Sequence, residues 1–146
     1  MPVIAIGSES SANKWRNTTH IFCAENSSLY EIRTKAFCEN EKLIYFDFTQ
    51  NTVRSIEAGA FFNCRRLSAA NVIFGTNLYV VGENAFNGSL YSETPMVLKI
   101  PANVSLVKSL GFGNLELAHG SSIQLGDESN KSKLYINTSY GVQSFA

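Results

Sequence analysis

The amino-acid sequence predicts a solenoid, a fold in which similar units stack and each buries its apolar edge against its neighbours. One segment occurs three times at a nearly constant spacing of about two dozen residues, and a strand-like segment recurs in step with it. The composition is that of an ordered chain, since 45% of the 146 residues are hydrophobic, 12% are aromatic and only 16% are charged. The three copies of the first segment are Leu29-x-x-Ile32-x-x-x-Ala36-Phe37, Val53-x-x-Ile56-x-x-x-Ala60-Phe61 and Leu78-x-x-Val81-x-x-x-Ala85-Phe86.

The N-terminal residues precede the clear repeats. Residues 1–18 are rich in Ser and Asn, and we expect them to form a cap or to be disordered. Residues 20–24 are expected to form the first strand, because they lie one repeat period before residues 44–48.

Residues 42–48 predict a strand because their aromatic and β-branched side chains favour that conformation. Strand side chains alternate, so Phe46 and Phe48 point to one side and Tyr45 and Asp47 to the other. One period later, residues 67–72 repeat the spacing of the apolar positions.

Between these strands, residues 57–64 have the small and polar side chains of a tight helical turn. The Ala-Phe pair common to the three copies lies in this turn, where Ala permits close approach of backbone and Phe fills the space between coils. Stacking then predicts an aromatic ladder inside the solenoid. Its rings are Phe37, Phe61, Phe86 and Phe112.

The later coils are less regular. Residues 87–97 form a longer segment than their counterpart, so one coil is expected to bulge there. The Ala-Phe pair is lost after Phe112, which predicts irregular repeats and a C-terminal cap over residues 113–146 behind a solenoid of residues 19–112. Further strands are expected at 115–117, 123–125 and 134–136, with a turn at Asp127–Asn130.

Two stretches carry the motif of a known repeat family. Residues 56–64 match I-x-x-x-A-F-x-x-C, and residues 98–107 match L-x-I-P-x-x-V-x-x-I with Val in place of the last Ile. The chain therefore resembles the BspA-like (Treponema pallidum-type) leucine-rich repeats over about residues 29–112. The resemblance implies a mostly β, right-handed coil of short parallel strands with short helical or 3-10 turns, in about five to six coils.

The resemblance also implies protein recognition, because BspA-like proteins are associated with cell-surface adhesion to host matrix proteins and cells, and so with virulence. In a leucine-rich-repeat arrangement the outward strand residues form an exposed sheet, here Ile21, Cys23, Tyr45, Asp47, Ala69, Asn71, Ile73, Val97 and Lys99. We predict partner binding by Tyr45, Asp47, Asn71, Ile73 and Lys99, a mixture of aromatic, aliphatic and charged groups that suits a protein interface. The alternative is a face that is solvated or covered by a neighbouring domain.

Charge and composition argue against other partners. Twelve basic and twelve acidic residues cancel, so no long-range field favours nucleic acid, and the Arg65-Arg66 doublet is interpreted as a solvated edge. The apolar runs are too short to insert into a membrane. Poorly capped solenoid ends allow weak homodimerisation without requiring it.

No catalytic or metal-binding motif is present. The chain has no G-x-S-x-G, P-loop, H-E-x-x-H or dinucleotide-binding pattern. Its three cysteines show no C-x-x-C spacing, and only two histidines could add nitrogen ligands. We therefore expect a non-enzymatic protein with no cofactor and no metal.

Localisation stays open between two readings. The family resemblance favours a secreted or cell-surface protein, whereas residues 1–7 lack the basic start and long apolar core of a signal peptide. The second function hypothesis is accordingly a structural or scaffolding repeat segment, cytoplasmic or part of a larger solenoid, with no ligand of its own.

Overall fold

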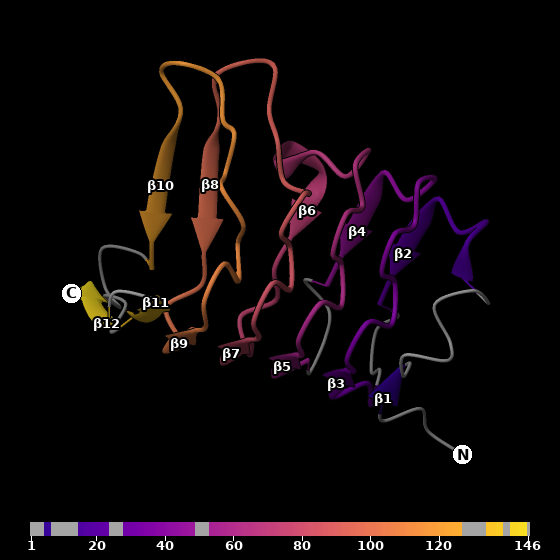
Figure 1. The fold of residues 1–146 in the computed structure, drawn as a ribbon, viewed down its shortest axis with the longest axis horizontal. Coiled ribbons are helices and arrows are strands. Elements are labelled where there is room, and N and C mark those ends of the chain that lie inside the picture. Colours follow the sequence, from indigo (N-terminus) through magenta and orange to yellow (C-terminus); the bar gives the residue numbers. More distant parts are fainter. Residues whose placement is uncertain are drawn as a thin grey trace.

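The computed structural model describes residues 5–6, 15–23, 28–48, 53–126, 134–138 and 141–145. They form a β-solenoid of about four turns with parallel strands and almost no helix, which confirms the predicted fold class (Figure 1). The structure has about four turns, fewer than the five to six coils expected from the sequence. The turn expected at Asp127–Asn130 lies outside the described residues.

One side of the solenoid is a seven-stranded sheet in the order β1-β3-β5-β7-β9-β11-β12. Its strands are β1 (Ala5–Ile6), β3 (Glu31–Ile32), β5 (Ser55–Ile56), β7 (Val80–Val81), β9 (Leu106–Val107), β11 (Leu134–Thr138) and β12 (Gly141–Phe145). All neighbours pair in parallel except the antiparallel pair β11 and β12. The buried residues Ile32, Ile56, Val81 and Val107 are aligned from strand to strand, as the repeat spacing predicts.

The opposite side carries two smaller sheets. The strands β2 (His20–Phe22), β4 (Tyr45–Asp47) and β6 (Val72–Ile73) form one, preceded at β6 by the short 3-10 helix η2 (Ala69–Asn71). The strands β8 (Val97–Ile100) and β10 (Ser122–Leu125) form the other. In Figure 1, β8 stands apart from β6, whereas β4 and β6 are close neighbours.

The turns that carry the Ala-Phe pairs connect the two sides and are bonded from coil to coil. The Phe37 N–H donates to the Ala60 carbonyl (2.8 Å), and the Phe61 N–H donates to the Ala85 carbonyl (2.7 Å). These segments are chains of tight turns rather than the helical turn expected from the sequence. The physical reason is a left-handed residue in each: φ is 63° at Gly59, which ends any helical run.

The predicted aromatic ladder is present and fills the core. Phe37 and Phe61 stack with ring centroids 5.3 Å apart, Phe61 and Phe86 are 5.0 Å apart with ring planes only 2° from parallel, and Phe86 and Phe112 are 6.1 Å apart. All four rings are buried. Phe46 from β4 stacks on Phe61 at 5.1 Å, so the ladder also contacts the smaller sheet. Stacked, fully buried rings of this kind contribute more than their area alone.

A column of polar residues runs beside the ladder and was not predicted. Asn40, Cys64 and Ser89 occupy the same position in successive coils, and each donates to a carbonyl of the coil before it. The Asn40 amide donates to the Trp15 carbonyl (2.6 Å), the Cys64 thiol to the Phe37 carbonyl (3.1 Å) and the Ser89 hydroxyl to the Phe61 carbonyl (2.7 Å). The cysteine of the repeat motif therefore satisfies a carbonyl that coil stacking buries.

Candidate recognition face

The outward sides of β2, β4, β6 and β8 form the surface on which the predicted binding residues lie, and we call it the strand face. Strand pairing sets Tyr45 beside His20 and Asp47 beside Phe22. Asp47 is also paired with Ile73 of β6. Residues about one period apart in sequence thus become lateral neighbours on one surface.

The register of β2 corrects the sequence-based assignment of its outward residues. Ile21 pairs with the buried Phe46 and, like Cys23, packs against the core, so both predictions of outward side chains were wrong. His20 and Phe22 point outward instead. The structure pairs β2 with β4 one position later than the alignment expected from the sequence, and a shift of a single position moves each side chain to the other face of a strand.

The corrected register produces an exposed aromatic cluster. The His20 and Phe22 rings stack at 6.1 Å and 8°, and the Tyr45 ring lies 5.8 Å from His20 and 5.4 Å from Phe22. Phe22 is 67% exposed, the highest value among the large hydrophobic side chains of the described residues. Aromatic side chains clustered at a surface are of the type that anchors protein interfaces.

The cluster borders an acidic group. The Tyr45 hydroxyl donates a long hydrogen bond to Asp47 Oδ2 (3.4 Å). Partial burial, followed by the charge of Asp47 and this hydrogen bond, raises the pKa of Tyr45. The phenol therefore stays a hydrogen-bond donor through the neutral range, next to a carboxylate that accepts.

Asn71 and Ile73 continue the strand face from η2 into β6. The Ser68 hydroxyl accepts from the Ala70 N–H (3.3 Å) and so caps η2, which turns Asn71 outward as an exposed side chain. Ile73 is half-buried beside Asp47. Ala69, expected on the outward side, is buried because the 3-10 helix breaks the strand alternation there.

Lys99 lies on β8, across a groove from the other four residues. The alternation of β8 is regular, with Val97 and Lys99 exposed and Leu98 and Ile100 buried. The structure therefore places Tyr45, Asp47 and Ile73 on one sheet, Asn71 in the 3-10 helix just before β6, and Lys99 on the next sheet. Asn71 and Lys99 are exposed, whereas Tyr45, Asp47 and Ile73 are half-buried. Their role in binding stays a prediction.

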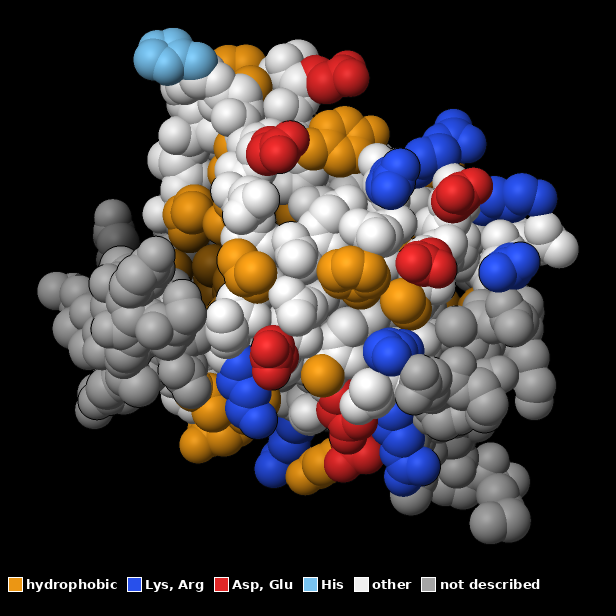
Figure 2. Space-filling model, in the orientation of Figure 1, with side chains coloured by type: hydrophobic (Ala, Val, Ile, Leu, Met, Phe, Trp, Pro, Cys, Tyr) orange, Lys and Arg blue, Asp and Glu red, His pale blue; other side chains and the backbone are white. Residues whose placement is uncertain are grey.

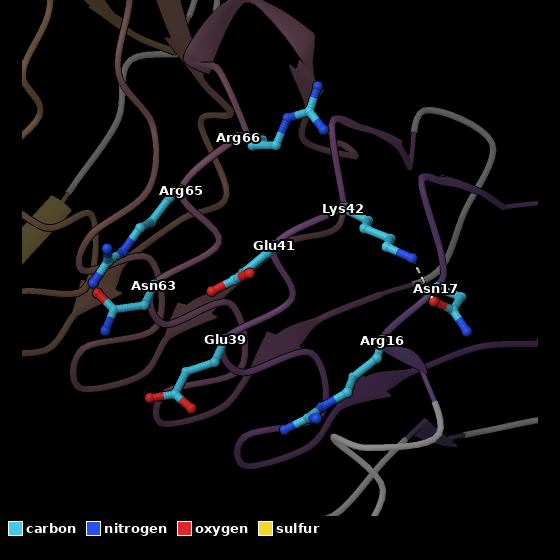
Figure 3. A pocket seen from close by; sticks show the side chains of 8 residues that line it. All are labelled: Arg16, Asn17, Glu39, Glu41, Lys42, Asn63, Arg65 and Arg66. Carbon is cyan, nitrogen blue, oxygen red and sulfur yellow. Dashed lines mark hydrogen bonds between the residues drawn. The ribbon is translucent and has the colours of Figure 1, made fainter.

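A depression of about 920 Å³ lies over the turns that precede β2, β4 and η2 (Figure 3). Its charged side chains come from three successive coils, with Arg65 and Arg66 exposed as expected and Glu39 and Glu41 between them and Arg16. The Lys42 ammonium donates to Asn17 Oδ1 (2.8 Å). Its four cationic side chains outnumber its two carboxylates, so the lining has a net positive charge. On the side seen in Figure 2, cationic and acidic side chains are interspersed.

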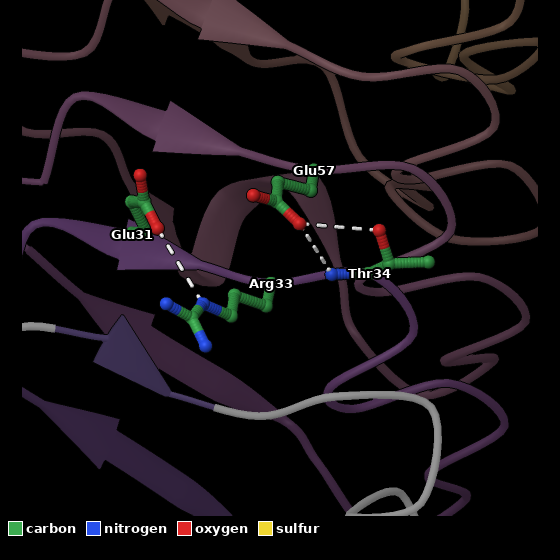
Figure 4. A network of polar contacts seen from close by, with 4 residues as sticks. All are labelled: Glu31, Arg33, Thr34 and Glu57. Carbon is green, nitrogen blue, oxygen red and sulfur yellow. Dashed lines mark hydrogen bonds and ion pairs between the residues drawn. The ribbon is translucent and has the colours of Figure 1, made fainter.

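Polar contacts on the seven-stranded side are structural. Glu57 Oε2 accepts from the Thr34 N–H (2.9 Å) and from the Thr34 hydroxyl (3.1 Å), which joins two neighbouring coils (Figure 4). Glu31 and Arg33 form an exposed ion pair at 3.5 Å within one coil. Exposed pairs of this kind contribute little to stability.

The described residues offer little for metal or thiol chemistry. Among them, no group of three His, Cys, Asp or Glu side chains is placed to hold a metal ion. Burial raises the pKa of Cys64 to about 12, so its thiol is a structural donor rather than a nucleophile. No helix in the described ranges is long and apolar enough to cross a membrane.

Stacked coils with a regular exposed strand face define a repeat scaffold of the leucine-rich-repeat type. The model of the family described as BspA type Leucine rich repeat region (6 copies) matches residues 5–93, and the chain belongs to this family. Leucine-rich repeats generally mediate protein–protein interaction, this fold is typically a non-enzymatic binding scaffold, and BspA-like proteins are often surface-associated. No curated protein and no solved structure matches the chain.

Proposed function

We propose that this chain is a non-enzymatic recognition module that binds a protein of a host cell surface or extracellular matrix through its strand face. Tyr45, Asp47, Asn71, Ile73 and Lys99 make the contacts, with His20 and Phe22 added from the geometry of β2. The module acts at the cell surface as an adhesion protein.

The observation that carries this proposal is the exposed cluster of His20, Phe22 and Tyr45 beside Asp47. Phe22 is 67% exposed and lies against two other rings, and a contiguous exposed patch of this kind, more than a single exposed side chain, marks a contact site. Burying these rings against a partner would supply apolar area, while the Tyr45 hydroxyl and the Asp47 carboxylate would fix orientation.

The test measures capture of the chain by immobilised extracellular matrix proteins and by intact host cells. The variant Tyr45→Ala with Asp47→Ala removes the centre of the strand face, and Phe22→Ala removes the most exposed ring. The matched control is Tyr79→Ala, because Tyr79 is 56% exposed but precedes β7 on the seven-stranded side. Circular dichroism melts verify that each variant is folded.

The proposal expects capture by the wild-type chain and by Tyr79→Ala, and a loss of at least about tenfold in affinity for each strand-face variant, as for a residue at the centre of an interface. If the wild-type chain binds neither matrix proteins nor cells, the scaffolding function replaces adhesion. If Tyr79→Ala weakens capture and the strand-face variants do not, the binding surface lies on the other side.

A further inference from the structure

A groove of about 560 Å³ divides the strand face between β6 and β8. Most of its lining residues are apolar, with Ile73 on one side and Met96 and Val97 on the other, but polar atoms contribute nearly half of its exposed surface. Lys99 is the one charged side chain among the described residues that line it. The groove is therefore a depression that combines apolar side chains with polar atoms and carries a single positive charge.

A local insertion explains why the two coils separate here. On the opposite side the same coils are paired directly, strand β5 with β7. On the groove side Ser68 pairs with Tyr91. The stretch from Ser68 to Val72, the first buried residue of β6, is shorter than the stretch from Tyr91 to Leu98, the first buried residue of β8. These extra residues before β8 carry the strand out of register, so the coils diverge toward the groove (Figure 1).

The separation leaves two strand edges facing one groove. Within the described residues, β6 pairs only with β4, and β8 pairs only with β10. The other edge of a strand carries backbone N–H and C=O groups that can pair with an added strand. Elsewhere in the described solenoid, each inner coil is covered by the next on both sides.

We propose that this groove binds an extended segment of the protein partner, with apolar side chains at alternate positions and an acidic residue opposite Lys99. The inference rests on the proposed recognition function and specifies how part of the partner is held. The segment pairs through its backbone with the exposed edges of β6 and β8. Such strand addition derives affinity from backbone hydrogen bonds and specificity from every second side chain.

The chemistry of the lining selects this occupant. Ile73 and Val97 present branched apolar side chains on either side of the groove, which match the inward residues of an extended chain. Lys99 is exposed and follows Val97 by two positions on β8. Its positive charge favours a segment with a carboxylate over a segment with a cation at that point.

The experiment selects random nonapeptides, displayed on phage, against the immobilised wild-type chain, against Lys99→Glu and against Lys108→Glu. Lys108 is also exposed but follows β9 on the seven-stranded side, which makes it a matched control for charge. Enriched peptides are synthesised, and their affinities are measured with and without N-methylation of the backbone. Melting curves confirm that both variants fold, and sedimentation reports self-association.

The proposal expects that the peptides selected against the wild type and those selected against Lys108→Glu have the same pattern, with apolar residues at alternate positions and one acidic residue. These peptides bind Lys99→Glu about five- to tenfold more weakly, since an exposed ion pair is lost and a repulsion added. Lys99→Glu selects a basic residue at the same peptide position. N-methylation within the paired register weakens binding by at least about tenfold.

Three results would overturn the groove assignment. They are the absence of enriched peptides, enrichment without a change of charge preference in Lys99→Glu, and binding that N-methylation leaves unaltered. A dimer that Lys99→Glu dissociates would make a second copy of the chain the occupant instead. If protein capture is lost in Tyr45→Ala with Asp47→Ala but no peptide preference exists, the proposed function stands without the groove.

Discussion

Replacement of Phe61 by alanine tests whether the coils stack, and the strand face depends on that stacking. Phe61 is fully buried and contacts three other rings, with centroids 5.3 Å from Phe37, 5.0 Å from Phe86 and 5.1 Å from Phe46. Emptying a buried aromatic site costs about 3–5 kcal/mol. Three ring pairs of about 0.5–1.5 kcal/mol each place this site near the upper end, at about 5 kcal/mol.

Urea unfolding measures this loss, followed by circular dichroism and by the fluorescence of Trp15, the single tryptophan, whose ring lies 5.7 Å from Phe37 at the end of the ladder. A loss of about 5 kcal/mol rivals the whole stability of a small domain, so Phe61→Leu serves as a milder variant with an expected loss of about 1–2 kcal/mol. Phe22→Ala is the exposed control and should cost under about 1 kcal/mol. A loss for Phe61→Ala as small as that of the exposed control would refute the stacked core.

Three further predictions concern the turns and the polar column. Leu110 has a left-handed backbone (φ 52°) at the position that Asn84 occupies in the preceding coil, so Leu110→Asn should raise the free energy of unfolding by about 0.5–1 kcal/mol; a lower urea midpoint would count against this. Ser89→Ala leaves the buried Phe61 carbonyl and the buried Cys64 N–H with only their long bond to each other (3.4 Å), and should cost about 1–2 kcal/mol, against almost no change for the exposed Ser122→Ala. Burial raises the pKa of Cys64 from 9.0 to about 12, so the unfolded chain binds fewer protons above pH 9 and stability falls as the pH rises toward 12. Between pH 9 and 10.5 the wild type should lose about 1.5 kcal/mol more than Cys64→Ser, and equal losses would show that this thiol is not buried in the folded state.

The sequence predicted the parts of the fold that repeat in phase. The near-constant spacing of the repeats identified Phe37, Phe61 and Phe86 as one column, because only large apolar residues recur there. It also located the bulge at residues 87–97. Asn40, Cys64 and Ser89 have the same spacings as these rings and could have been found by it. They were missed because three different residue types perform one task, donation to a buried carbonyl.

The strand face was predicted less well, for a local reason. Ile21 and Phe22 are both apolar, so alternation alone cannot decide which of them points inward; the pairing of Ile21 with Phe46 decides it. The aromatic cluster follows from that register and was therefore invisible in the sequence. The division of the face into two sheets depends on where the extra residues before β8 are accommodated, which periodicity does not specify.

The most direct test of the central claim is amide hydrogen exchange of the chain with and without a captured matrix or cell-surface protein. If stacking makes one recognition surface from distant residues, protection should appear together at residues 20–22, 45–47, 71–73 and 97–100, with little change at Tyr30 and Tyr79 on the seven-stranded side. Protection confined to one coil, or centred on the seven-stranded sheet, would contradict the claim that the strand face binds the partner.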